Sequence, residues 1–142
     1  MSVKRYKSIA DNTITNAFES NLQFRATGSN IGAADSLEIF SIYAQANSSS
    51  YEKSRVIMKF PVVTADETGS ISSIASDRTN GKIPASGSVN FYLNLYNVRH
   101  DQTLPRQFYL VVSPISQSWE EGIGVDLDNY KDLTYDGTGS NW

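Results

Sequence analysis

Alternation of apolar and polar side chains along the chain predicts short β-strands separated by turns. The clearest strand spans residues 88–96, in which Val89, Phe91, Leu93 and Leu95 fall on one face. Such period-two alternation is typical of a strand in an antiparallel sheet with one buried face. The other face of this strand carries asparagine and tyrosine rather than charge, which suits contact with another surface.

Other stretches also have the composition of strands. They are 55–60, ended by Pro61; 108–112, stopped by Pro114; 37–43; and a weaker strand around 13–15. Proline ends a strand because it cannot donate a hydrogen bond to the ladder. Within 37–43 the apolar parity changes between Ile39 and Phe40, which indicates either that both faces are covered or that a bulge resets the register.

Clusters of glycine, serine and asparagine separate the predicted strands and predict turns at 28–32, 47–50, 79–81 and 84–87. The polar span from 62 to 88 is predicted to be a loop or an excursion over the surface, and no amphipathic helix is predicted. The fold class is therefore all-β, an antiparallel β-sandwich with jelly-roll character. We expect its core to include Ile14, Leu37, Val56, Met58, Phe60, Val89, Phe91, Leu93, Leu110, Val112 and Trp119.

The length of 142 residues predicts a single domain over 1–142, with residues 1–10 as an N-terminal arm. Only about five strands are predicted, whereas a jelly roll uses about eight. The sequence ends at Trp142 after a Gly/Ser turn, which resembles the entrance to another strand. We expect either sequence beyond Trp142 or a neighbouring subunit to complete the sheets, because unpaired edges invite pairing with another chain. The isolated chain is expected to be aggregation-prone or marginally stable.

Composition narrows the function classes. The chain has no cysteine, which excludes disulfides, thiolate metal sites and a cysteine nucleophile. A net charge of −3 argues against nucleic acid as the main partner. No apolar run is long enough for a secretory signal or a membrane span. The basic start, with Lys4, Arg5 and Lys7, is interpreted as a mobile or docking arm.

Candidates for catalysis are weak. His100 is the single histidine and adjoins Asp101, but neighbouring residues on a strand point to opposite faces and no nucleophile elbow is present. Glu120 and Glu121 follow Trp119. Paired carboxylates next to an aromatic ring suggest glycoside hydrolysis, yet adjacent residues seldom flank one bond. We interpret the histidine as a loop residue and the glutamates as solvated, and predict that the chain is not an enzyme.

An acidic cluster raises the possibility of calcium. Its members are Asp126, Asp128, Asn129 and Asp132. Oxygen ligands at this spacing suit Ca²⁺, but Lys131 interrupts the order of an EF-hand loop. Phosphate-binding glycine loops are absent as well. We therefore predict a solvated turn, no bound metal and no cofactor.

Aromatic residues are the best candidates for a binding face. Tyr92 and Tyr96 share the outward face of the strand at 88–96, together with Asn90 and Asn94, and the two rings form a platform about 13 Å long. Tyr130, Tyr135 and Trp142 are further candidates. Such rings either stack on sugars or anchor protein interfaces. The asparagines favour coverage by protein, since their amides suit interface hydrogen bonds.

The order of the segments resembles the DNRLRE-type, or disaggregatase-related, β-sandwich family. The chain carries similar motifs over most of its length: an aspartate followed by a short strand at 10–14, an N-x-G turn at 28–32, an R-x-hydrophobic-hydrophobic-x-F strand at 54–61 and a W-x-E-G corner at 116–122. The stretch 83–89 leads into a strand where the family has an Ala/Leu-rich one. The resemblance implies a jelly-roll-like fold, found in carbohydrate-binding contexts and in secreted surface proteins.

Two further segments resemble structural proteins of marine tailed phages. They are Ser-Trp-Glu-Glu-Gly at 118–122 and Thr-Tyr-Asp-Gly-Thr-Gly-Ser-Asn-Trp at 134–142. The resemblance implies a virion structural protein, a capsid decoration or a tail or neck component, that contacts copies of itself and other virion proteins after assembly in the host cytoplasm. The alternative is a carbohydrate-binding module of an extracellular or cell-surface protein.

Overall fold

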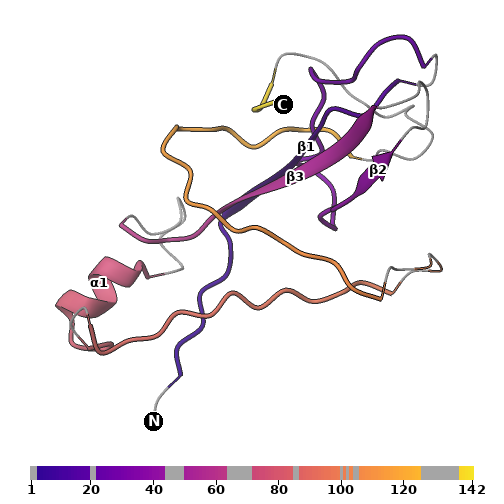
Figure 1. The fold of residues 1–142 in the computed structure, drawn as a ribbon. Helices are drawn as coiled ribbons and strands as arrows, with labels where there is room; N and C mark the ends of the chain where they lie inside the picture. Colours follow the sequence, from indigo (N-terminus) through magenta and orange to yellow (C-terminus); the bar gives the residue numbers. More distant parts are fainter. Residues whose placement is uncertain are drawn as a thin grey trace.

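The computed structural model describes residues 3–19, 22–43, 50–63, 72–84, 87–99, 101, 103, 106–125 and 138–142. Its regular elements are strands β1 (Ala10–Thr15), β2 (Ser41–Tyr43) and β3 (Tyr51–Lys59) and the helix α1 (Ile74–Thr79). The strands form one antiparallel sheet in the order β1-β3-β2. Figure 1 shows this sheet at one end of the molecule and α1 at the other, joined by long extended segments.

The pair β1 and β3 is the centre of the fold. Its register places Thr13 opposite Val56 and Ile14 opposite Arg55, so β-branched side chains line both strands, as sheets prefer. The predictions of strands around 13–15 and 55–60 are confirmed, although each strand is longer than expected. The strand predicted at 37–43 is confirmed only over β2, because the chain leaves the ladder before Phe40.

The core beneath this sheet is small and unusually polar. Its buried apolar side chains are Ile14, Ala17, Phe18, Ala26 and Ile31. The threonines of β1 are buried with them, and Thr15 is satisfied by donating to the Lys53 carbonyl at 3.0 Å while accepting from the Ala17 amide. Buried hydroxyls with partners are tolerated in a core because their hydrogen bonds offset the cost of desolvation.

The helix α1 lies within the stretch predicted to be a loop, so the expectation of no helix there is wrong. Ser73 caps its N-terminus by accepting from the Ser76 amide at 3.0 Å. Its C-terminus ends in a left-handed Gly81, with φ of 69°, and the Lys82 amide donates to the Asp77 carbonyl at 2.8 Å. This is a Schellman arrangement, and the two caps define a helix too short to show an apolar period.

The prediction that the apolar side chains of 88–96 and 108–112 form part of the core is wrong for the single chain. Phe91 is 58% exposed, Leu93 42%, Leu110 45% and Val112 75%. The cause is that neither stretch forms a strand among the described residues, so the alternating side chains have no second sheet to pack against. Leu37, Val56, Met58, Phe60, Val89 and Trp119 are half-buried, and Ile14 is buried as expected.

The coarse prediction of an all-β fold agrees with the structure, since strands outnumber the one short helix in the described part of the chain. A sandwich or jelly roll stays a prediction, because the described residues contain one sheet. None of the helices in that part is long and apolar enough to cross a bilayer.

Candidate interaction surface

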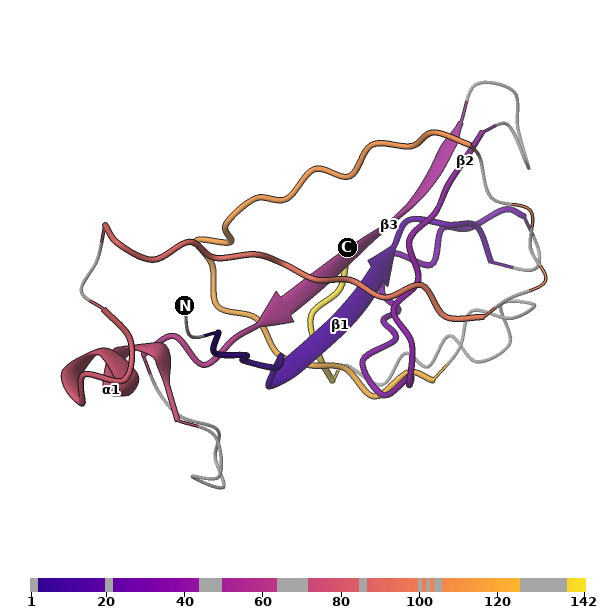
Figure 2. The same cartoon turned by 90° about the horizontal axis from the view of Figure 1, so that it is seen from below.

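Two extended segments dominate the exposed surface. Residues 87–99 run outward from α1 and residues 106–125 return toward the sheet, and Figures 1 and 2 show both as long traces outside the β1-β3-β2 sheet. Val89 to Tyr96 and Phe108 to Ser118 make no backbone hydrogen bond to another described residue. We call the first segment (87–99) the outbound arm and the second (106–125) the return arm.

The outbound arm carries most of the residues predicted to form a binding face. Tyr92 is 80% exposed and Tyr96 is 87% exposed, and Asn90 and Asn94 beside them are exposed too. From the helix, the Arg78 guanidinium lies over the Phe91 ring of the arm, 5.8 Å from its centre. The structure therefore brings these four residues together on one accessible segment.

The other predicted binding residues are elsewhere. Trp142 is half-buried with its ring 3.8 Å from the Arg55 guanidinium of β3, so it is separate from the tyrosine platform. Stacking of this kind fixes the end of the chain against the sheet. Tyr130 and Tyr135 lie outside the described residues.

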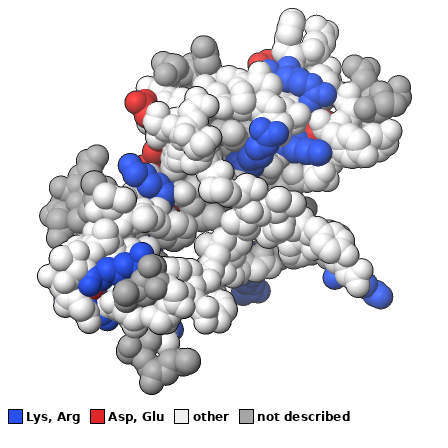
Figure 3. Space-filling model, turned by 60° about the vertical axis from the view of Figure 1, so that its left-hand side comes forward, with Lys and Arg blue, Asp and Glu red and all other residues white. Residues whose placement is uncertain are grey.

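Absence of charge sets the arms apart from the rest of the surface. No Lys, Arg, Asp or Glu occurs between Ser88 and Val98 or between Gln107 and Ser118, whereas Arg99 and Arg106 flank the tip. Figure 3 shows a projection without charged side chains that ends in basic ones, while most cations gather elsewhere. Natural proteins avoid leaving uncharged, extended, apolar segments exposed, because such segments pair with other chains.

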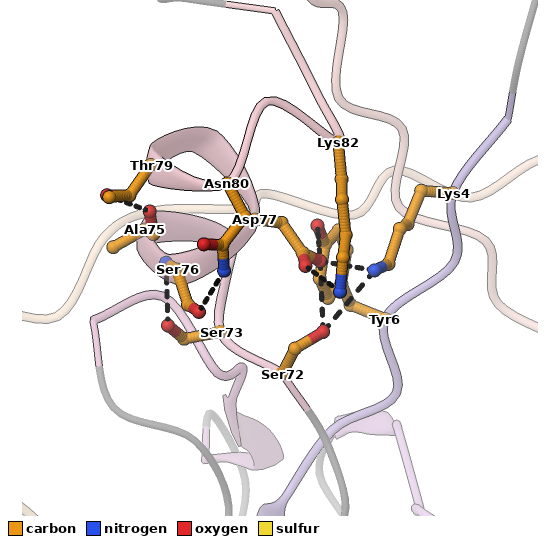
Figure 4. A network of polar contacts seen from close by, with 10 residues as sticks. All are labelled: Lys4, Tyr6, Ser72, Ser73, Ala75, Ser76, Asp77, Thr79, Asn80 and Lys82. Carbon is orange, nitrogen blue, oxygen red and sulfur yellow. Dashed lines mark hydrogen bonds and ion pairs between the residues drawn. The ribbon is translucent and has the colours of Figure 1, made fainter.

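The root of the outbound arm is held by a buried carboxylate. Asp77 of α1 accepts hydrogen bonds from the Tyr6 hydroxyl at 2.8 Å and from the Ser72 hydroxyl at 3.0 Å. It also forms an ion pair with Lys4 and lies 3.6 Å from the Lys82 ammonium. Figure 4 shows these side chains converging on Asp77 from the N-terminal segment and from both sides of the helix. We call this group the Asp77 cluster.

Electrostatics in the Asp77 cluster shift two pKa values. The hydrogen bond from Lys4 lowers the pKa of Asp77 from 3.8 to about 2, against the opposing effect of burial, with help from Tyr6 and Ser72. Burial raises the pKa of Tyr6 from 10.0 to about 12, and the hydrogen bond to the Asp77 carboxylate and its charge add to this shift. Asp77 therefore stays ionised and Tyr6 stays neutral across neutral pH.

The stabilising effect of the cluster is expected to depend on pH at both extremes. Because the pKa of Asp77 is depressed, its contribution is present above about 3.8 and is lost as pH falls toward about 2. Because the pKa of Tyr6 is raised, its contribution is present below about 10 and is lost as pH rises toward about 12. Urea unfolding of the wild type and of Tyr6→Phe and Asp77→Asn measures this. The loss of stability caused by Asp77→Asn should shrink as pH falls toward about 2, and the loss caused by Tyr6→Phe should shrink as pH rises toward about 12. Losses that stay constant over both pH ranges would contradict the assignment.

A second cluster ties the end of the return arm to the sheet. Asn30 is 2% exposed, and its amide nitrogen donates to the Thr138 carbonyl and to Asn141 Oδ1, both at 2.9 Å. Gly122 and Gly124 pack directly on it, so that a Cβ on Gly124 would lie 1.8 Å from the Asn30 carbonyl oxygen. We call this the Asn30 cluster. The sequence alone gives these two glycines no such role, which becomes visible only from their contact with Asn30.

The candidates for chemistry do not assemble into a site in the described residues. Glu121 accepts a hydrogen bond from the Asp11 amide at 2.8 Å, which gives it a place at the edge of β1. Glu120 is exposed, and its main chain pairs with Ser140. Asp101 is exposed, while His100 and the acidic cluster at 126–132 lie outside the described residues. Among those that are described, no group of His, Cys, Asp or Glu could hold a metal.

A shallow hollow lies next to the sheet. It is lined by Lys59, Gln117, Ser118 and Trp119. Trp119 was predicted to fill the core, but it is half-buried at this hollow beside the C-terminal end of β3.

The chain was compared with models of protein families, with curated proteins and with solved structures, and none of them matches it. The function therefore has to be argued from the surface described above.

Proposed function

We propose that the chain is a structural subunit of a larger assembly and acts through repeated protein–protein contacts. The observation that carries this proposal is the uncharged stretch in each arm, residues 88–98 and 107–118, where large apolar side chains are exposed. Tyr109 is 94% exposed and Val111 90% exposed on the return arm, and the outbound arm is similar. Single exposed apolar residues are normal, but contiguous ones mark an interaction surface.

A virion is the assembly that suits this subunit best. Capsid decoration and tail or neck proteins are repeated many times, so one self-complementary surface is used at high local concentration. The similarity of residues 118–122 and 134–142 to structural proteins of tailed phages supports the same assignment. We therefore propose a capsid decoration or a tail or neck component of a tailed phage.

Mass spectrometry of purified particles tests this proposal. Peptides of the chain should be present at a fixed and high copy number relative to the major capsid protein. They should remain after washing with high salt, since residues 88–98 and 107–118 of the arms carry no charge. Absence of the chain from intact particles, with its presence in the lysate, would contradict a virion role.

Carbohydrate binding is the second candidate, and the exposure of Tyr92 and Tyr96 is the observation that favours it. If this function holds, a glycan array should give micromolar binding to a defined sugar that is lost in Tyr92→Ala and in Tyr96→Ala, because aromatic rings stack on sugar faces. Tyr109→Ala is the matched control, since Tyr109 is equally exposed on the other arm. We expect no such binding, and tyrosine-dependent binding would favour the glycan function over the structural one.

A further inference from the structure

The sheet has an open edge on β3. The Asn16 amide donates to the Lys53 carbonyl at 3.1 Å, so odd-numbered residues of β3 direct their backbone groups toward β1. The Ser54 amide donates to the Phe40 carbonyl at 3.1 Å, so even-numbered residues direct theirs to the opposite side, toward β2. This parity follows from the alternation of hydrogen-bonded and non-hydrogen-bonded pairs in antiparallel ladders.

The chain on the β2 side does not continue along β3 beyond Phe40. The Glu38 amide points to Thr13 Oγ1 instead, at 3.4 Å, and the Glu38 carbonyl accepts from the Ser54 hydroxyl. The backbone N–H and C=O groups of Val56 and Met58 are therefore left without a backbone partner among the described residues. Main-chain groups at a sheet edge of this kind accept an added strand.

The positive charges on β3 disfavour direct pairing of this edge with the same edge of a second copy. Two copies of the chain could pair their β3 strands antiparallel along this edge, with Ile57 of one copy opposite Ile57 of the other. In that register Arg55 of each copy lies opposite Lys59 of the other copy. Like charges directly opposite each other destabilise a sheet. The edge thus selects against a copy of itself and favours a strand without positive charge.

The outbound arm supplies such a strand. Residues 88–96 are uncharged and alternate in polarity, and from Val89 to Tyr96 their backbone groups form no hydrogen bond to the backbone of any described residue. If the apolar residues of the arm lie beside Val56 and Met58, then the asparagine and tyrosine side chains fall on the face of Arg55 and Lys59. Tyrosine rings and amide oxygens both interact favourably with cations.

We propose that residues 88–96 of one copy add as a strand to the β3 edge, at Val56 and Met58, of a second copy. This inference rests on the proposed function, a subunit that acts through repeated protein–protein contacts, and identifies a second copy of the chain as the partner of the outbound arm. The donor comes from another copy because the outbound arm runs well below the sheet in Figure 1 and crosses it in Figure 2, rather than lying along β3. The return arm is the poorer donor, since Tyr109 and Val111 make both of its faces apolar and Pro114 interrupts it.

Two blocked variants test the proposal on the purified chain. Leu93→Pro removes an N–H of the donor strand, and Met58→Pro removes one from the acceptor edge. Sedimentation velocity over a range of concentrations should show self-association of the wild type, weakened at least about a hundredfold in either variant. A mixture of the two variants should form a 1:1 dimer, because Met58→Pro still donates its arm and Leu93→Pro still accepts one. Val111→Pro is the matched control on the return arm and should associate like the wild type.

Disulfide trapping keeps the test independent of folding defects in the proline variants. The chain has no cysteine, so a Met58→Cys protein mixed with a Phe91→Cys or Leu93→Cys protein should give an oxidised heterodimer, whereas Tyr109→Cys should not. A wild type that stays monomeric at all concentrations, or association abolished by Val111→Pro but not by Leu93→Pro, would overturn the proposal. Both experiments use the isolated chain, so a failure here is distinct from absence of the chain from virions.

Discussion

Gly124→Ala is expected to destabilise the protein by about 3 kcal/mol, the upper part of the range for overpacking. A Cβ at this position would lie 1.8 Å from the carbonyl oxygen of Asn30, which is backbone and cannot move aside without disturbing the bond from the Ile31 amide to the Thr13 carbonyl. Gly122→Ala should have an effect of similar size, because its Cβ would lie 1.5 Å from Asn30 Oδ1. The Asn30 side chain is fixed by its own hydrogen bonds to Thr138 and Asn141.

Urea unfolding followed by circular dichroism measures this effect. The matched control is Gly81→Ala, whose added Cβ meets nothing within 4 Å and whose only cost is the left-handed φ of 69°, about 1 kcal/mol. If Gly124→Ala loses no more stability than Gly81→Ala, then the Asn30 cluster does not hold the return arm against the sheet as described.

Asp77→Asn is expected to open α1 while the sheet stays closed. An asparagine keeps the shape of the side chain but loses the charge that pairs with Lys4 and Lys82. Hydrogen bonds to charged groups are stronger than neutral ones, so amide exchange over 74–84 should become at least about tenfold faster. Amides of β1 and β3 should keep their wild-type rates, because the described side-chain partners of Asp77 all lie outside these strands.

Hydrogen exchange followed by mass spectrometry reads both regions at once. Asp35→Asn is the matched control, since it removes a charge from an exposed position far along the chain from α1. Equal acceleration in α1 and in the sheet would mean that the Asp77 cluster and the sheet unfold as one unit, which would contradict the local role.

The alternation of apolar residues predicted β1 and β3 correctly, yet the same signal at 88–96 did not predict a buried strand. The pattern reports that a segment has one face to bury, but it does not say which chain buries that face. For Val56 the partner is Thr13 of the same chain. Phe91 and Leu93 have no paired strand of the same chain among the described residues, and both remain exposed.

The helix and the two polar clusters were beyond prediction for different reasons. The helix α1 has too few residues for an apolar period, and its signals were the capping residues Ser73 and Gly81, which also suit an ordinary turn. The Asp77 and Asn30 clusters join residues far apart in the sequence, such as Tyr6 with Asp77. Such contacts depend on how the chain returns on itself, which no local pattern encodes.

The two tryptophans provide a built-in optical probe of the open edge. Trp142 stacks on Arg55, and Trp119 lines the hollow beside Lys59, so the rings flank the stretch of β3 that contains Val56 and Met58. A cation near an indole ring changes the intensity and wavelength of its fluorescence. Any strand that docks between Arg55 and Lys59 should therefore alter the emission of the unlabelled protein. Trp142→Phe and Trp119→Phe would assign the change to the Arg55 end or to the Lys59 end of the edge.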